Sequence, residues 1–279
     1  MGVAIVADSA ANLPDDMARE LGIEVVPMYL NFGDQVYRDG RDLTPSHFYE
    51  RLVRDGEVAS TSTPSPGDYL EAFERTGREE ILCVTVASSM SSSHQQASLA
   101  AERFPGRVEV LDSLNAAMAE GFVAVEAARA AAGAGSLDEV LARAKEVAHR
   151  ARLYATVDTF EFLRKSGRVT KLQAYAATML DIKPVFGFRE GEIVPISRTR
   201  TKRKALARIV EDAVREMEDR PVHLAALHAA AVAEALELAE RISARATVVE
   251  KSDHRGDSGD RRSHGSGPGW GGFLLRLRR

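Results

Sequence analysis

Short runs of β-branched and other apolar residues alternate with helical patterns along most of the chain. In the first half these runs lie at residues 3–7, 23–29, 81–86 and 107–111. Short apolar runs that are separated by helices are typical of parallel strands buried on both faces of a sheet. The alternation therefore predicts an α/β fold in which helices cover a mainly parallel sheet.

Helix starts between these runs carry a capping residue followed by proline, at Thr44-Pro45 and again at Ser65-Pro66. Proline fits the first helical position because that position needs no backbone N–H donor. Asp68 adds a negative charge near the positive end of the second of these helices. Residues 115–132 and 136–150 are rich in alanine with periodic Val and Leu, and they are predicted to form an antiparallel helix pair.

The strand pattern returns near residue 153 and begins a second series of strands and helices. Within it, residues 186–194 carry alternating apolar residues on both sides of Glu190-Gly191, which is typical of a β-hairpin. We therefore predict an N-terminal α/β domain over residues 1–152 and a C-terminal mixed α/β domain over residues 153–250.

The segment from Lys251 to Arg279 differs in composition from the rest of the chain. It has seven glycines and six arginines but no Ala, Val, Ile or Glu, and its seven basic residues outnumber its three acidic ones. Such composition is typical of a disordered or nucleic-acid-binding tail. A change of reading frame at the end of the gene is the second interpretation. Either one predicts that residues 251–279 lack regular structure.

The charge balance and the missing motifs narrow the classes of function. Lysine and arginine number 37 and aspartate and glutamate 41, so the net charge of −4 gives no overall field for nucleic acid or an acidic membrane. No apolar stretch reaches the length of a membrane span, which predicts a cytoplasmic protein without stable membrane insertion. One cysteine, scattered histidines and the absence of nucleotide-binding and hydrolase motifs predict no metal, no cofactor and no nucleic-acid partner.

Two clusters of hydroxyl residues remain as candidates for chemistry. Residues 61–65 hold four hydroxyls before the helix that starts at Pro66, and residues 88–93 hold five serines after the strand that ends at Val86. Ligands of open α/β sheets bind at the carboxyl ends of the strands, and helix starts favour anions. Hydroxyls without a fixed cation suit a carboxylate, so the clusters predict a neutral anion site. The alternative is that Ser65 only caps a helix and that the serines form a flexible loop.

The basic run from Arg198 to Lys204 follows a predicted strand and precedes a predicted helix. One interpretation is a solvated surface, which is the usual place for such a run. The other is a docking or phosphate site, because arginine binds phosphate and carboxylate oxygens in pairs. The residues alone leave both interpretations open.

Several segments, in one order, resemble the DegV family of bacterial proteins. Val6-Ala7-Asp8-Ser9-Ala10-Ala11-Asn12-Leu13-Pro14 is similar to the family's opening V-T-D-S-T-A-D-L-P, and residues 61–69 are similar to its T-S-Q-P-S-P-G-D-F. Further similar segments lie at residues 111–113, 157–168, 182–184 and 200–206. The resemblance implies a two-domain α/β fold that binds a long-chain fatty acid between its domains and presents it to a separate fatty-acid kinase.

The resemblance also implies which residues contact the ligand and the kinase. It assigns the carboxylate to the Thr61-Ser62 pair and Ser91, and the kinase-facing arginine to Arg200. Two positions depart from the family pattern. Ser92 stands where the family has glycine, which causes strain if that position needs a positive φ. His264 stands near the family's ligand-side histidine, but in the sequence R-S-H-G-S-G instead of G-x-H-T-G-P-G.

Two hypotheses from different classes follow. In the first, the protein is not an enzyme but a lipid-binding carrier that holds a fatty acid in an apolar tunnel, with the hydroxyls orienting its head group. In the second, it is an enzyme acting on a phosphorylated small molecule, with residues 198–204 as a phosphate clamp. The first is favoured, because the sequence offers no convincing base or metal for the second.

Overall fold

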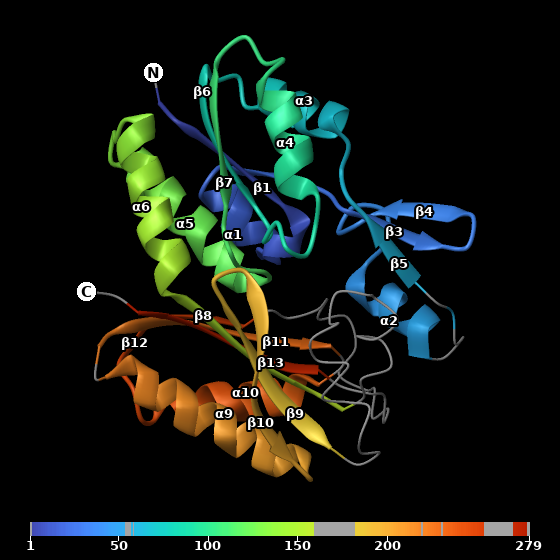
Figure 1. Cartoon of the computed structure of the whole chain (residues 1–279), viewed down its shortest axis with the longest axis vertical. Helices are drawn as coiled ribbons and strands as arrows, with labels where there is room; N and C mark the ends of the chain where they lie inside the picture. The colour runs from blue at the N-terminus through green and yellow to red at the C-terminus, as the bar shows by residue number, and fades with distance from the viewer. Residues whose placement is uncertain are drawn as a thin grey trace. The chain divides into compact units, whose positions relative to one another are not determined.

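The chain folds into two units (Figure 1). The computed structural model describes residues 2–53, 57, 59–158, 182–218, 220–229, 231–253 and 270–277. The first unit consists of Met1–Thr44, Val58–Ala151 and Glu190–Glu192, and the second of Pro45–Glu57, Arg152–Arg189 and Ile193–Arg279. The division into domains at residues 1–152 and 153–250 stays a prediction.

A four-stranded parallel sheet forms the centre of the first unit, in the order β2-β1-β6-β7. Its strands are β1 (Ala4–Asp8), β2 (Ile23–Val26), β6 (Glu80–Thr85) and β7 (Arg107–Asp112). Ile5 pairs with Ile23 on one side and with Leu82 on the other. The α/β class with a parallel sheet, predicted from the apolar runs, is thereby confirmed.

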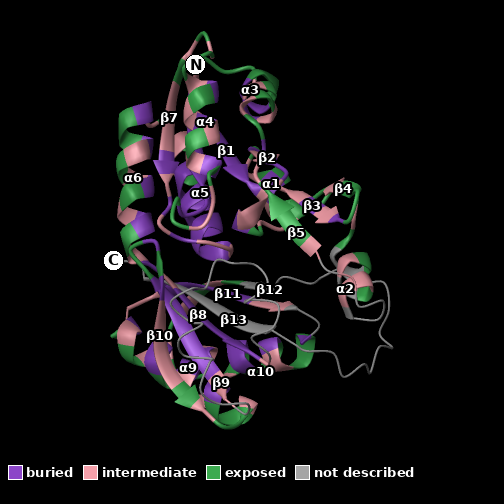
Figure 2. Cartoon of the chain, turned by 45° about the vertical axis from the view of Figure 1, so that its right-hand side comes forward, coloured by how far each residue is buried: buried purple, intermediate pink, exposed green. Residues whose placement is uncertain are grey.

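Helices cover both faces of this sheet, because successive side chains of a strand point to opposite faces. Ile5 and Leu82 pack with α5 (Met118–Ala132) and α6 (Leu137–Arg150). Val6 and Cys83 face the other way and pack against α3 (Pro66–Arg75) and α4 (Ser93–Ala101). Figure 2 shows α5 buried along most of its length, as expected for a helix between a sheet and a second helix. The remaining short helices are η1 (Ser9–Ala11) and α1 (Asp15–Glu20).

A small antiparallel sheet, ordered β4-β3-β5, extends the first unit. Its strands are β3 (Tyr29–Phe32), β4 (Gln35–Arg38) and β5 (Ala59–Ser62). One continuous strand over residues 23–29 was predicted, and this is wrong. Pro27 lies between β2 and β3 and has no N–H to donate to a ladder, so the chain leaves the parallel sheet there.

The second unit contains a mixed six-stranded sheet in the order β10-β9-β8-β13-β11-β12. Its strands are β8 (Ala151–Val157), β9 (Lys183–Arg189), β10 (Glu192–Thr199), β11 (Val222–Ala229), β12 (Val248–Asp253) and β13 (Trp270–Leu277). Helices α9 (Lys202–Met217) and α10 (Val232–Ser243) pack their apolar faces on it, and α2 (Pro45–Val53) belongs to the same unit. Glu190 and Gly191 both have positive φ, at 49° and 80°, as a tight hairpin turn requires.

The end of the chain corrects one expectation. Residues 251–279 were predicted to lack regular structure, yet Lys251–Asp253 complete β12 and Trp270–Leu277 form β13. Strand β13 pairs antiparallel with β11 over eight residues, from Trp270 to Leu277. The composition of the whole segment concealed the apolar run F-L-L-R-L within it. Residues 254–269, with His264, lie outside the described residues.

Candidate functional site

The two predicted hydroxyl clusters meet in the first unit. Thr63 follows β5, and its Oγ1 lies 3.4 Å from Ser91 Oγ and 3.1 Å from Ser92 Oγ. Ser91 Oγ is in turn 2.9 Å from Ser93 Oγ. We call Thr63, Ser91, Ser92 and Ser93 the hydroxyl cradle. It stands after β6, at the carboxyl edge of the parallel sheet, where this fold class binds its ligands.

Thr61 and Ser62 lie in β5, directly before the cradle. They pair in register with Leu30 and Tyr29 of β3, and both are exposed. The Ser62 hydroxyl accepts a hydrogen bond of 3.2 Å from Asn31 Nδ2. The residue that joins the two clusters is thus Thr63, which the sequence analysis did not single out.

Ser65 is occupied by the helix that follows it. Its Oγ accepts a hydrogen bond of 3.2 Å from Asp68 N, and its own N–H and hydroxyl both donate to Asp68 Oδ2 at 2.7 Å. Burial acts to raise the pKa of Asp68, but these bonds and one from the Tyr29 hydroxyl lower it overall. Ser65 therefore caps α3, as the simpler interpretation of the sequence held.

The serine loop shows no strain at the position that departs from the family pattern. Ser92 has a φ of −79°, so the replacement of glycine by serine costs nothing there. Ser92 occupies the N-cap position of α4, but its side chain makes no capping bond to that helix. Its hydroxyl faces Thr63 instead, and the first N–H of α4, at Ser93, donates to Ser91 Oγ at 3.3 Å.

Two carboxyl groups that are 0% exposed lie in the same unit, at Asp8 and Glu120. Asp8 ends β1 and accepts hydrogen bonds from Ala10 N at 3.0 Å and Val86 N at 3.1 Å. Burial raises the pKa of Asp8 to about 6 against these two bonds. Burial, followed by the charge of Asp8, holds the pKa of Glu120 well above its usual range. Glu120 was not among the predicted site residues, although an almost entirely apolar α5 implies that an acid within it is buried.

The basic run lies in the second unit, between β10 and α9. Arg200 is exposed, and among the described residues it has no ion-pair partner. Lys202 Nζ is 2.9 Å from Asp158 Oδ2 and 2.9 Å from Glu234 Oε1. Because two carboxylates already neutralise Lys202, the phosphate-clamp hypothesis loses one of its cations.

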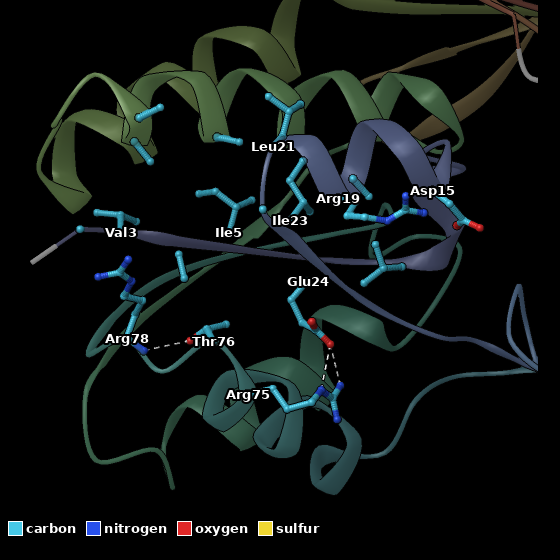
Figure 3. A pocket seen from close by; sticks show the side chains of 18 of the residues that line it. Val3, Ile5, Asp15, Arg19, Leu21, Ile23, Glu24, Arg75, Thr76 and Arg78 are labelled. Atoms are coloured by element: carbon cyan, nitrogen blue, oxygen red, sulfur yellow. Dashed lines mark hydrogen bonds and ion pairs between the residues drawn. The ribbon is translucent and has the colours of Figure 1, made fainter.

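An open depression of about 800 Å³ lies elsewhere on the first unit (Figure 3). Val3, Ile5 and Ile23 line it, and its polar rim includes the ion pair between Arg75 and Glu24. None of the predicted site residues lines this depression. Among the residues that the structure describes, no cluster of His, Cys, Asp and Glu is arranged to hold a metal. Within the same residues, no helix combines the length and the apolar character that crossing a membrane requires.

The sequence matches a family model described as an uncharacterised protein of the DegV family over residues 2–261. Protein DegV of Bacillus subtilis is 30% identical over 259 residues, which cover 90% of this chain and 91% of that protein. A DegV domain-containing protein of Streptomyces coelicolor is 34% identical over 246 residues, or 87% of each chain.

Solved structures of similar proteins have the same fold. A DegV family protein of Thermus thermophilus, described by its fatty-acid binding, has a TM-score of 0.88 and 29% identity, covering 99% of this chain and 100% of that one. DegV of Bacillus subtilis, described as a fatty-acid-binding protein, has a TM-score of 0.84 and 26% identity over the full length of both chains. Together with the family match along almost the whole sequence, this likeness establishes that the chain belongs to the DegV family.

Proposed function

We propose that this protein binds a long-chain fatty acid and that the hydroxyl cradle, together with the Thr61-Ser62 pair directly before it in β5, holds the ligand's carboxylate. The observation that carries the proposal is the meeting of Thr63 with Ser91 and Ser92 at the carboxyl edge of the parallel sheet. Each hydroxyl can donate one hydrogen bond to an anion. The fatty-acid binding described for the relatives from Thermus thermophilus and Bacillus subtilis supports the same ligand.

The carboxylate and the acyl chain of the fatty acid contribute differently to its binding. Burial of the acyl chain contributes about 0.8 kcal/mol for each CH₂, so the tail supplies most of the affinity. The hydroxyls then determine which end of the ligand is held, and they need no buried cation to do so. A carrier of this kind needs neither a cofactor nor catalytic activity of its own.

Replacing Thr61 and Ser91 together by alanine is expected to weaken fatty-acid binding. Each lost bond to the carboxylate costs about 1.5–3 kcal/mol, which corresponds to roughly ten- to a hundred-fold in the dissociation constant. Folding is expected to survive, because Thr61 is exposed and Ser91 is only half-buried. Titration of the purified, delipidated variant with a fluorescent fatty acid measures the loss.

Ser60→Ala is the matched control for this experiment. Ser60 is an exposed hydroxyl on the same strand β5, paired with Asn31 and outside the cradle. The Ser60→Ala protein should bind the fatty acid with wild-type affinity. An unchanged dissociation constant in the Thr61/Ser91 double variant would contradict the assignment of the carboxylate to this site.

We propose further that the bound fatty acid is presented to a separate fatty-acid kinase in the bacterial cytoplasm, with Arg200 facing that partner. The exposed guanidinium of Arg200, in the connection between β10 and α9, suits recognition of an acidic surface or a phosphate. Ser62 and Ser92 belong to the same proposal as further ligand contacts. So does His264, which lies outside the described residues.

Arg200→Ala is expected to retain bound fatty acid but to lose most of its phosphorylation by a cognate kinase. A hydrogen bond to a charged group contributes about 1.5–3 kcal/mol, so loss of the Arg200 contact is expected to lower the rate or affinity by roughly ten- to a hundred-fold. Arg203→Ala, which removes another exposed cation of the same run, provides the matched comparison. Mass spectrometry measures the bound lipid, and a coupled kinase assay measures transfer. An Arg200→Ala protein that is purified empty, yet still binds the kinase, would assign Arg200 to the ligand instead.

A further inference from the structure

A pair of buried carboxyl groups lies behind the hydroxyl cradle. Asp8, at the end of β1, and Glu120, in the first turn of α5, are both 0% exposed. The two elements approach closely: a methyl group added to Gly121 would lie 2.8 Å from the carbonyl oxygen of Ala11. Helix α5 therefore packs against the segment that follows Asp8, and the side chains of Glu120 and Asp8 interact directly.

The two carboxyl groups differ in the hydrogen bonds that they accept. Asp8 accepts bonds from Ala10 N and Val86 N, and Val86 begins the loop that leads to Ser91. Neither oxygen of Glu120 makes a hydrogen bond of good geometry within the described part of the chain. The polar group that acts on it most strongly is Asp8. Two carboxyl groups in such a place cannot both ionise, so the pair retains a proton at neutral pH.

A series of hydroxyls connects this pair to the cradle. Ser93 is 0% exposed, and its hydroxyl acts directly on the Asp8 carboxylate. Ser93 Oγ is 2.9 Å from Ser91 Oγ, which lies 3.4 Å from Thr63 Oγ1. Ser93 therefore lies between Asp8 and Ser91, the residue to which the anion would bind.

The other titratable groups that act on the pair are also acids. They come from three elements around it: Asp112 ends β7, Tyr69 lies on α3 and Cys83 on β6. Burial raises the pKa of Tyr69 and of Cys83 well above their usual values, so both are neutral at physiological pH. Asp112 accepts bonds from the backbone N–H groups of Leu114 and Ser88. A bound carboxylate thus enters a site whose interior charge is negative.

We propose that binding of a carboxylate ligand at the hydroxyl cradle is coupled to uptake of one proton from solvent by the Asp8–Glu120 pair. This inference rests on the proposed function. The anion on Ser91 repels the charge on Asp8 through a poorly solvated interior, and protonation of Asp8 removes that repulsion. The proton forms an O–H bond on the pair, and no other bond changes. Asp8 and Glu120 are positioning residues, because they act through Ser93 and do not touch the ligand.

The sign of the resulting pH dependence follows from linkage. The pKa of Asp8 in the free protein is about 6, and a bound anion raises it. Over the pH range between these two values the complex holds more protons than the free protein. Affinity for the carboxylate therefore falls as pH rises through that range, by at most about tenfold per pH unit.

Titration calorimetry with decanoate at pH 7, in phosphate and in Tris, tests the coupling in the wild-type chain. Decanoate is ionised at this pH, and the two buffers differ in ionisation enthalpy, so the difference in heat counts the protons taken up. A fraction of one proton per decanoate is expected. Binding without proton uptake would overturn this inference and leave the fatty-acid site intact. Absence of binding both of decanoate and of the fluorescent long-chain fatty acid would contradict both.

Variants identify the group that takes the proton. Asp8→Asn should bind decanoate without proton uptake, with an affinity independent of pH and at least equal to wild type at pH 8. If Asp8 had only a structural role, Asp8→Asn would instead bind decanoate more weakly at every pH. Glu126→Gln is the matched control, because Glu126 is a buried acid on the same helix whose charge is paired with Arg129 and Arg143. It should retain proton uptake.

A direct measurement covers the case in which Asp8→Asn does not fold. The carboxyl carbon of Asp8 can be followed by NMR as a function of pH in the wild-type protein, with and without decanoate. The midpoint of its titration is expected to move to higher pH when the ligand is bound. An unchanged midpoint, or proton uptake that persists in Asp8→Asn, would overturn the assignment of the proton to Asp8.

Discussion

A chain that ends at Gly269 is expected to lose the fold of its second unit. Strand β13 lies inside the six-stranded sheet, between β8 and β11, and it pairs with β11 over eight residues. Without it, β10-β9-β8 and β11-β12 become two separate small sheets with unpaired edges. A two-stranded sheet is marginal on its own in water, so the core that β11 and β12 share with α9 and α10 loses its support. Hydrogen exchange of the β11 amides, compared with the full chain, measures this loss.

The matched control is a chain that ends at Leu277. It removes two arginines but retains every residue of β13, so β11 should be protected as in the full chain. If the chain ending at Gly269 instead protects β11 normally, Trp270–Leu277 is not part of the sheet. The interpretation of residues 251–279 as a tail outside the fold would then regain support.

The parallel sheet was predictable because burial on both faces leaves a local signal. Strands β1 and β6 are short apolar runs in which Val6 and Cys83 point to one helix layer and Ile5 and Leu82 to the other. No solvent-facing position interrupts such a run, so it is visible without knowledge of its partners. The hairpin turn at Glu190-Gly191 was predictable for a similar reason, since its residue types report the positive φ angles directly.

The missed elements are those whose signal depends on a single residue or on distant pairing. Pro27 divides the apolar run that was assigned to one strand, because it cannot donate to the ladder. Strand β13 has an ordinary apolar run, but its place beside β11 is set by pairing between residues about fifty positions apart. Glycine and arginine around it dominate the average composition, which is why the segment resembled a tail.

The candidate site likewise has a part that local sequence predicts and a part that depends on strand pairing. The serine loop was predicted from its position after β6, which is a rule of the fold class. Which hydroxyl meets it depends on the register of β5 with β3, where Ser62 opposes Tyr29 and Thr61 opposes Leu30. That register places Thr63 beside Ser91, and a sequence without its partner strand does not specify it. Glu120 required the further step of recognising that α5 is apolar on all sides.

Phe73→Ala is expected to destabilise the first unit by about 3–5 kcal/mol, the usual cost of removing a buried aromatic ring and leaving a cavity. Phe73 is 0% exposed and lies in the layer between the sheet and helices α3 and α4. Its ring centroid is 5.9 Å from that of Phe104, at an interplanar angle of 76°, and 6.3 Å from that of Tyr69. The edge-to-face contact with Phe104 adds to the loss that burial alone predicts. Urea unfolding measures the change as a shift of the midpoint at constant slope.

Leu99→Ala provides the comparison for this substitution, since Leu99 is 38% exposed on α4 and its truncation should change stability by no more than about 0.5 kcal/mol. Helices α3 and α4 begin beside the hydroxyl cradle, at Pro66 and Ser93, so the layer that Phe73 fills also holds the cradle in place. Fatty-acid binding by Phe73→Ala should therefore fall in step with the folded fraction as urea is added. A loss of stability below about 1 kcal/mol, or binding that fails while the unit is still folded, would contradict this role for the aromatic layer.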